Sequence, residues 1–256
     1  MIAADEKYRQ DGYQIYSNVL SADELAQAHE EIARLWSDRE LTAAGNGRTR
    51  VRDSLSGTPV VDRLDPVCDL SPFFDSLARS DRLARIIVDA TGQEMVLFKD
   101  KLIVKPAGAG GYGLHQDFMR WQSFGPAPTE MVNLAVALDD VHEANGAIEA
   151  YAGQHGELLT PTGVTADPHP DDVDEQRRVL INLAAGDIFV FNPLLPHLSG
   201  FNRTNGSRSI LFFTYSAVDY GDLRPTYYAR HAEIFGDALG KKVVPMQVQR
   251  RNDPRP

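Results

Sequence analysis

The segment GYGLHQDFMRW, residues 111–121, contains a histidine and an aspartate two positions apart. Side chains at positions i and i+2 of a β-strand project from the same face, so a strand here would present His115 and Asp117 together. An imidazole and a carboxylate placed in this way can bind one metal ion between them. His-x-Asp triplets also occur by chance in strands and loops, so the metal hypothesis requires a third ligand elsewhere in the chain.

His197 is the candidate for that third ligand, because it follows a strongly apolar segment and lies in FNPLLPHLSG. Arg208 lies eleven residues later, at the start of another apolar run. The Asn- and Gly-rich segment between the two predicts a tight connection that brings them onto neighbouring strands facing one cavity. Two histidines and one carboxylate form the facial triad that leaves open positions on Fe(II), and a nearby guanidinium is suited to bind a carboxylate with two hydrogen bonds.

Two helical regions precede these residues. The segment 21–36 opens with Ser21 and Glu24 in a capping-box relation and continues with apolar residues on one helical face. The segment 71–92 reads as a second helical region that ends at Gly92. Both regions are expected to pack as flanking helices on the domain that carries the candidate site.

Short apolar runs separated by turn residues dominate the chain from Met95 onward. This texture indicates a β-sandwich or barrel and not the alternation of strands and helices that is typical of a parallel sheet. The predicted fold class is therefore mainly β with flanking helices. The expected strands cover residues 95–105, 131–138, 178–183, 187–192 and 209–218.

The length of 256 residues fits one large domain, which we expect to span residues 1–240. Residues 241–256 are basic, show no apolar period and are expected to form a solvated or partly ordered tail. Within the domain, the Pro- and Asp-rich segment 160–178 is long enough to be a lid over a binding site. A surface excursion without a role is an equal alternative for this segment.

The net charge of -10 argues against a nucleic-acid partner, because neutralising phosphates requires a surplus of Lys and Arg. Cys68 is the only cysteine, so neither an intrachain disulfide nor a thiolate metal cluster can form. The N-terminal residues are charged, and no apolar run approaches the length of a membrane span. We therefore expect a cytoplasmic protein with a small-molecule substrate and no membrane association, and its oligomeric state stays open.

The ordered set of His115, Asp117, His197 and Arg208 resembles the pattern of the phytanoyl-CoA dioxygenase family of Fe(II)/2-oxoglutarate oxygenases. Similar stretches are DKLIVKP before the first motif, NPLLPHLSG at the second, DGYQIYSNVLSADEL near the start and ANGAIEAYAGQHGELL in the middle, so the resemblance covers most of the chain. It implies a double-stranded β-helix, the jelly-roll barrel shared with cupins. It also implies that both histidines and the aspartate bind iron, that Arg208 binds the distal carboxylate of 2-oxoglutarate, and that O₂ is consumed.

Four further residues fall where the family is expected to contact its co-substrate, and they have alternative structural roles. Lys101 could be a surface lysine on a barrel strand, Arg63 could form a loop salt bridge, and Ser199 could cap a turn. Gln116 lies between the two ligands of the first motif. The candidate co-substrate contacts beside Arg208 are therefore Arg63, Lys101, Gln116 and Ser199.

A second set of residues is expected to flank the substrate cavity with aromatic walls and polar groups. The same aromatic side chains could fill the core beneath the barrel mouth, and Arg120 could hold an anionic substrate group or pair with an acidic surface residue. An acyl-CoA, an amino acid-like metabolite and a natural-product intermediate all stay open. Because no large basic patch for a CoA diphosphate is visible, a small or medium polar metabolite is favoured. The candidate substrate contacts are Tyr112, Phe118, Arg120, Trp121 and Asn133.

The resemblance implies an oxidation that consumes 2-oxoglutarate and O₂ and yields succinate and CO₂. Asp117 favours hydroxylation over halogenation, because halogenating relatives place a small residue at this ligand position. Desaturation or ring closure with the same oxidant are alternatives. Two rival functions are a noncatalytic jelly-roll protein that binds a metal or small ligand, which would not need Arg208, and an iron dioxygenase that uses O₂ without 2-oxoglutarate.

Overall fold

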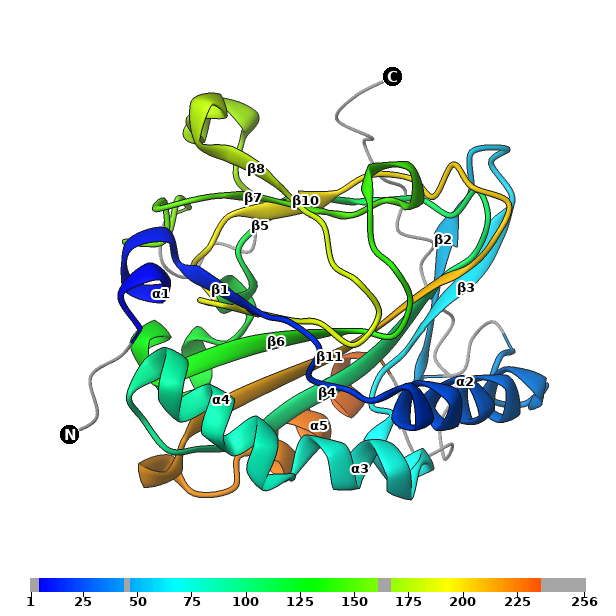
Figure 1. Ribbon diagram of the computed structural model, residues 1–256, viewed down its shortest axis with the longest axis horizontal. Coiled ribbons are helices and arrows are strands. Elements are labelled where there is room, and N and C mark those ends of the chain that lie inside the picture. The colour runs from blue at the N-terminus through cyan, green and yellow to red at the C-terminus, as the bar shows by residue number, and fades with distance from the viewer. Residues whose placement is uncertain (1–4, 44–46, 161–166, 236–256) are drawn as a thin grey trace.

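The computed structural model describes residues 5–43, 47–160 and 167–235, which form two facing antiparallel β-sheets with helices on one outer side (Figure 1). The larger sheet has seven strands and the smaller sheet has four. Across the larger sheet lie, in order, β1 (Tyr13–Tyr16), β9 (Ile188–Phe191), β6 (Met131–Ala137), β11 (Arg208–Ala217), β4 (Met95–Lys105), β3 (Pro59–Leu64) and β2 (Thr49–Asp53). Across the smaller sheet lie β5 (Tyr112–His115), β10 (His197–Ser199), β7 (Ile148–Tyr151) and β8 (Arg178–Ile181).

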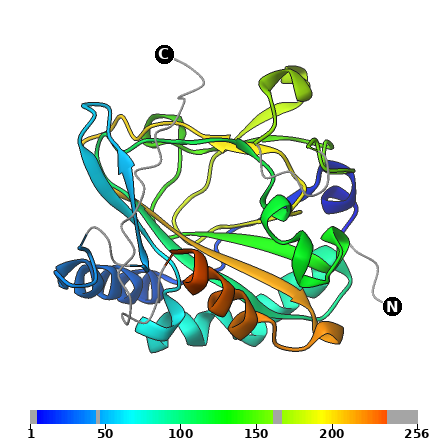
Figure 2. The ribbon, with the colours of Figure 1, turned by 180° about the vertical axis from the view of Figure 1, so that it is seen from behind.

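Helices cover the outer face of the larger sheet and bury a continuous apolar layer against it. Leu102 of β4 and Leu211 of β11 are fully buried in this layer, together with Leu83 and Ile87 of a covering helix. Seen from behind, α5 lies on the same side of the sheet as α3 and α4 (Figure 2). The α-helices of the described residues are α1 (Glu6–Asp11), α2 (Ala22–Ser37), α3 (Pro72–Ala78), α4 (Asp81–Thr91) and α5 (Arg224–Phe235).

The inner face of the larger sheet lines the space between the sheets. Ile103 of β4 and Ile210 of β11 are cross-strand neighbours, and Ile210 packs into a second core between the two sheets. Because side chains alternate along a strand, β4 has an outer row that is apolar except for Asp100 and an inner row that is largely basic. The inner row of β4 contains Lys99, Lys101 and Lys105.

The two facing sheets and their covering helices confirm the expected fold, a mainly β jelly roll with flanking helices.

The first predicted helix is confirmed as α2, and its capping box is present, with Glu24 and Ser21 exchanging side-chain to backbone hydrogen bonds. The second helical region is wrong in one respect, because it divides into α3 and α4. Ser80 ends the continuity, since its hydroxyl accepts a hydrogen bond from the backbone N–H of Leu83 and so caps a new helix. Gly92 ends α4 in the left-handed conformation, as predicted.

All five strand segments expected from the sequence form strands, with ends displaced by no more than two residues. The hairpin of β2 and β3 was not predicted, because charged side chains interrupt its apolar alternation. Arg52 of β2 is buried against the carboxylate of Asp62 on β3, and its guanidinium lies 3.3 Å from the ring centroid of Tyr112. An ion pair between the two strands thus stabilises this hairpin, and the alternation of apolar residues by which strands are predicted from a sequence is missing.

Two expectations concern parts of the chain that the structure describes only partly. The tail expected at 241–256 lies outside the described residues, as does the centre of the segment 160–178. The described flank of that segment contains two short 3-10 turns, Pro170–Asp172 and Glu175–Arg177. In the described ranges, no helix combines the length and apolar character needed to cross a lipid bilayer.

Candidate metal centre and active site

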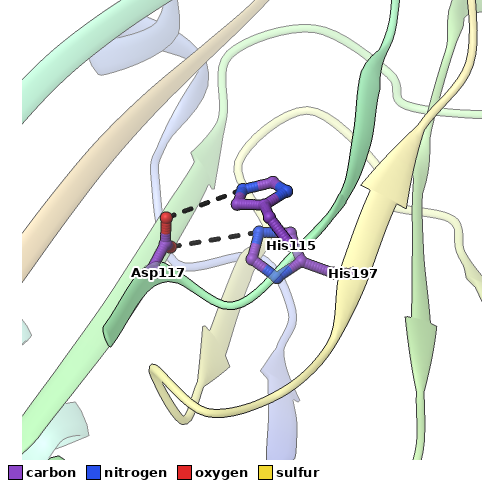
Figure 3. A group of neighbouring side chains, drawn as sticks. All are labelled: His115, Asp117 and His197. Carbon is purple, nitrogen blue, oxygen red and sulfur yellow. Dashed lines mark ion pairs between the residues drawn. The ribbon is translucent and has the colours of Figure 1, made fainter. Parts of the chain in front are cut away.

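His115, Asp117 and His197 lie close together, with their polar atoms facing one another (Figure 3). The two histidines are cross-strand partners on β5 and β10. The Nε2 atom of His115 lies 3.6 Å from Oδ1 of Asp117, and Nε2 of His197 lies 3.9 Å from Oδ2. One ligand atom from each residue can be chosen so that all three lie within 4.8 Å of one another, which is the arrangement that a single metal ion requires.

The local structure of the first motif differs from the expected strand. β5 ends at His115, and Asp117 begins a 3-10 turn, Asp117–Arg120, so the two side chains do not share a strand face. The extended backbone of Gln116 followed by this turn brings the carboxylate back toward the histidine. At the start of the motif, a side chain on Gly111 would clash with the carbonyl oxygen of Ser199, so glycine allows β5 to approach β10 closely.

Backbone carbonyl groups orient both imidazole rings. Nδ1 of His115 lies 2.8 Å from the carbonyl oxygen of Gly113, and Nδ1 of His197 lies 2.9 Å from that of Leu195. A carbonyl oxygen can only accept, so each Nδ1 carries the proton and each Nε2 keeps a lone pair for a metal. Burial lowers the pKa of His197, which favours the neutral, metal-binding form of this ring.

Asp117 is held in place and kept ionised by its neighbours. Asn133 donates from Nδ2 to Oδ2 of Asp117 at 2.9 Å, and the hydroxyl of Thr214 donates to Oδ1 of Asn133 at 2.8 Å. Burial alone would raise the pKa of the Asp117 carboxyl, but the positive charge of Lys101, and that of either histidine when it is protonated, lowers it to about 2. Two neutral imidazoles and one carboxylate fit a divalent iron ion and leave part of its coordination sphere open.

Arg208 is the first residue of β11 and is only 2 % exposed. It lies beside Lys105, Ser199 and Gly146, and this buried group of residues is called the Arg208 pocket. One of its terminal nitrogens donates to the carbonyl oxygen of Gly146, whereas its Nε atom is buried without a hydrogen-bond partner. Lys105 donates to the carbonyl of Gly146 at 3.2 Å, to Oγ of Ser199 at 3.2 Å and to the carbonyl of Gly200 at 2.7 Å. A buried guanidinium with an unpartnered N–H fits a carboxylate ligand, as the resemblance implied.

The expected placement of His197 and Arg208 on neighbouring strands is wrong. His197 lies on β10 of the smaller sheet, and Arg208 lies on β11 of the larger sheet, so their connection crosses between the sheets. The two sheets face each other, and for this reason both side chains still reach the enclosed space. Burial lowers the pKa of Arg208 to about 10, so the group stays protonated at neutral pH.

The four weaker co-substrate candidates lie in three different environments. Ser199 lies at the Arg208 pocket, where its hydroxyl oxygen also accepts from the backbone N–H of Tyr112 at 3.2 Å. Gln116 has its amide fully used by backbone groups: Nε2 donates to the carbonyls of Glu157 and Leu194, and Oε1 accepts from the N–H of Leu159. Lys101 and Arg63 lie elsewhere, on the inner faces of β4 and β3.

The substrate candidates are also distributed unevenly. Trp121 and Asn133 line a narrow cavity beside Asp117. Phe118 packs with Trp121 in one apolar cluster and also lines a second, larger pocket. The hydroxyl of Tyr112 donates to Asp62 of β3 at 3.2 Å. Arg120 is exposed and lies 3.7 Å from the carboxylate of Asp167, which is the surface pairing considered as its alternative. The cavity is lined by Lys99, Lys101, Asp117, Trp121, Asn133, Phe212 and Thr214.

Sequence reasoning missed Lys99 and Lys105, which lie at the cavity and at the Arg208 pocket. The sequence did indicate that these two lysines lie on the same side as Lys101. The three lysines of KDKLIVK are separated by even numbers of residues, so on one strand they must share a face. Their inward direction was not apparent, because it depends on which face of β4 the helices cover. Thr214 was missed for another reason, since it acts only through Asn133.

The sequence of this chain is similar to one protein family and to several enzymes. The phytanoyl-CoA dioxygenase (PhyH) family model matches residues 8–210. A 2-aminoethylphosphonate dioxygenase from the uncultured bacterium HF130_AEPn_1 is 25 % identical over 183 residues, covering 70 % of this chain and 68 % of that protein. An ectoine dioxygenase from Nocardia farcinica is 26 % identical over 233 residues, covering 83 % and 76 %.

A solved structure shares the fold over nearly the whole chain. It is the epimerase SnoN in complex with Fe3+, alpha-ketoglutarate and nogalamycin RO, with a TM-score of 0.68 and 23 % sequence identity. The match covers 94 % of this chain and 91 % of that one. At this level of identity, the similarity supports the jelly-roll architecture alone.

Proposed function

Because the chain belongs to the phytanoyl-CoA dioxygenase family, we propose that His115, Asp117 and His197 bind Fe(II) and that Arg208 binds 2-oxoglutarate. The family expected from the sequence is confirmed, and with it the class of enzyme, an Fe(II)/2-oxoglutarate-dependent oxygenase. The observation that carries the residue assignment is the convergence of the three ligand atoms, with both Nδ1 atoms tied to carbonyl groups.

The residues of this chain have separate tasks in such a reaction. Iron, 2-oxoglutarate and O₂ together supply the oxidising equivalents and yield succinate and CO₂. Asn133 fixes the orientation of Asp117, and the carbonyls of Gly113 and Leu195 fix the imidazoles. At the other end of the co-substrate, Arg208 offers its unpartnered Nε–H to the distal carboxylate.

We expect the reaction to be hydroxylation of a small or medium polar metabolite. Asp117 occupies the ligand position that halogenating relatives leave open, and the names of the two relatives, 2-aminoethylphosphonate dioxygenase and ectoine dioxygenase, denote small polar substrates. The fold also supports other outcomes, since one structural neighbour is an epimerase. Desaturation, ring closure or epimerisation on the same site are therefore the alternatives that product analysis must separate.

The test begins with binding and continues with turnover. Anaerobic addition of Fe(II) and 2-oxoglutarate should produce a visible charge-transfer band, and a metabolite screen for succinate formation should find a substrate that gains one oxygen atom by mass spectrometry. No band with the wild-type protein would favour the noncatalytic jelly-roll alternative. Oxygen uptake with substrate but without succinate would instead indicate an iron dioxygenase that does not use 2-oxoglutarate.

A further inference from the structure

A bulge in β5 brings the side chain of Tyr112 beside that of His115. The cross-strand partner of His115 on β10 is His197, and the partner of Tyr112 is Ser199, so three residue steps on β5 match two on β10. Residues three positions apart on a regular strand point to opposite faces, and one extra residue cancels this alternation. The ring centroids of Tyr112 and His115 accordingly lie 6.5 Å apart.

The hairpin of β2 and β3 holds the Tyr112 ring in two ways. The guanidinium carbon of Arg52 lies 3.3 Å from the ring centroid, and the Tyr112 hydroxyl donates to Oδ2 of Asp62 at 3.2 Å. Arg52 and Asp62 form an ion pair and are only 2 % and 0 % exposed. A buried ion pair adds little net stability, because both charges lose their hydration. A role in fixing the orientation of Tyr112 accounts for its presence.

The backbone of Tyr112 is part of a second site, the Arg208 pocket. Its N–H donates to Oγ of Ser199 at 3.2 Å, and the same oxygen accepts from Nζ of Lys105 at 3.2 Å. Lys105 is the cross-strand partner of Arg208. Tyr112 therefore lies between the two places that the proposed function assigns to the ends of 2-oxoglutarate, with its backbone at one and its ring beside the other.

The middle of the co-substrate has different needs from its ends. If the proposed function is correct, the distal carboxylate lies at Arg208 and the opposite end lies at the metal. The two methylene groups between these ends offer no hydrogen bonds, so they require an apolar surface at a fixed distance. An aromatic ring that cannot turn provides such a surface.

We propose that the Tyr112 ring is the wall against which the methylene groups of 2-oxoglutarate pack, and that Arg52 and Asp62 are positioning residues that act through this ring. This inference rests on the proposed function and adds a wall and its supports to the co-substrate site. The sequence suggested Tyr112 as a contact of the primary substrate; the bulge and the contacts with the hairpin favour the co-substrate instead.

The first experiment compares 2-oxoglutarate with the two enantiomers of 4-methyl-2-oxoglutarate. Each compound is titrated without oxygen into full-length protein that holds Fe(II), and the charge-transfer band reports binding. A wall on one side of the chain should make the wild type reject the enantiomer whose methyl group faces Tyr112. In Tyr112→Ala, the affinity of this enantiomer relative to 2-oxoglutarate should rise by about tenfold or more, and that of the other should stay unchanged. Tyr112→Leu, which keeps an apolar side chain, should give a smaller change of the same kind.

The second experiment tests the supports of the ring. Arg52→Lys removes the planar group that covers the ring, and Tyr112→Phe removes the hydrogen bond to Asp62. Each should raise the half-saturating 2-oxoglutarate concentration by about three- to tenfold. Arg52→Lys should have no further effect in a Tyr112→Ala background, because a positioning residue acts only through the ring that it holds. A merely structural role of Arg52 would give additive effects.

Arg48→Lys is the matched control for a buried arginine in the same region. Arg48 precedes β2, is 4 % exposed and pairs with Asp69, and its substitution should change the 2-oxoglutarate titration by less than about twofold. The proposal is overturned if Tyr112→Ala changes the relative affinity of both enantiomers equally or of neither, or if Arg52→Lys acts additively. No band in the wild type would overturn the proposed function and this inference with it. A normal band with unchanged discrimination would overturn this inference alone.

Discussion

Arg208 and Lys105 are cross-strand partners on β11 and β4, and their side chains donate to the same carbonyl oxygen, that of Gly146. Two cations thus meet at one backbone acceptor in a buried pocket, and Ser199 adds a hydroxyl beside them. A carboxylate that enters this pocket would be attracted by both charges. The guanidinium would supply the directional hydrogen bonds, and the ammonium would supply mainly charge.

Arg208→Lys tests whether the guanidinium group binds 2-oxoglutarate. The substitution keeps the charge but removes the planar fork, so we expect the half-saturating concentration of 2-oxoglutarate to rise by about tenfold or more. Because Lys105 is unchanged, binding should be weakened and not abolished. Titrating 2-oxoglutarate into the variant and the wild type under anaerobic Fe(II) measures this. Unchanged iron affinity is the control, and an unaltered 2-oxoglutarate titration would remove Arg208 from the co-substrate site.

Asp117→Ala tests the candidate metal centre. Loss of the only carboxylate in the triad should abolish 2-oxoglutarate-dependent succinate formation and weaken Fe(II) binding. The Asp117 side chain is only 14 % exposed, but it lines the cavity and belongs to none of the apolar clusters, so the fold should stay intact, which circular dichroism and thermal unfolding can check. A variant that retains wild-type turnover would show that the triad assignment is wrong.

Asn133→Ala tests how the carboxylate ligand is oriented. Asn133 joins Thr214 to Asp117, and loss of a partner that orients a metal ligand typically costs about 10- to 100-fold in metal affinity or activity. We expect a loss of that size in Fe(II) affinity, measured by competition with a chelator. Thr214→Val removes only the outer hydrogen bond and should have a smaller effect. Equal effects of the two substitutions would argue against the proposed relay.

Gln116→Ala tests a structural role for a residue that lies between two metal-ligand candidates. Its buried amide makes three hydrogen bonds to backbone groups of other segments, so its loss should lower the free energy of unfolding by about 3 kcal/mol. Chemical denaturation of the variant gives this value. Gln93→Ala, which loses one hydrogen bond to Thr129 at the surface, should cost about 0.5 kcal/mol or less. A stable Gln116→Ala protein with impaired 2-oxoglutarate binding would instead support the co-substrate role expected from the sequence.

A pH-dependent contribution to stability is expected at the start of α2. Hydrogen bonds from Arg82 lower the pKa of Glu24 from its ordinary value of 4.5 to about 2. The folded-state pKa is depressed, so this pair stabilises the protein fully above about pH 4.5, and the contribution is lost as the pH falls toward 2. The difference in melting temperature between wild type and Glu24→Gln should therefore be larger at pH 6 than at pH 2.5. Glu30→Gln, on the exposed face of the same helix, is the control, and a pH-independent difference for Glu24→Gln would contradict this assignment.

The candidate triad could be predicted from the sequence because the types of its residues and their order along the chain already indicate a metal site. The strand pairing does not have to be known for this. His115, Asp117, His197 and Arg208 were all named, and the structure brings the first three together and places Arg208 in a buried pocket. The positions relative to strands were less accurate: Asp117 lies on a 3-10 turn, and His197 and Arg208 lie on different sheets. Strand ends and sheet membership depend on contacts that a local pattern does not contain.

Which residues lie next to one another around the cavity was harder to predict, although Arg63 and Lys101 were both named from the sequence. Arg63 and Lys101 are separated by many positions in the chain, and they become neighbours only through the register of β3 and β4. That register is determined by packing against the helices, which apolar periodicity within a single strand does not reveal. The division of the second helical region at Ser80 was missed because a serine cap competes with helix continuation only where tertiary contacts favour the break.

The alternation of lysines along β4 also protects the chain against misalignment during folding. A shift of one residue between β4 and β11 would turn Lys99, Lys101 and Lys105 toward the helices and would move Leu102 to the inner side. Three ammonium groups would then lie against Leu83 and Ile87, where each unpaired charge would be strongly unfavourable. A purely apolar strand could tolerate such a slip as a long-lived trap. The same charges proposed to recognise ligands in the native state thus make the competing registers too costly to persist.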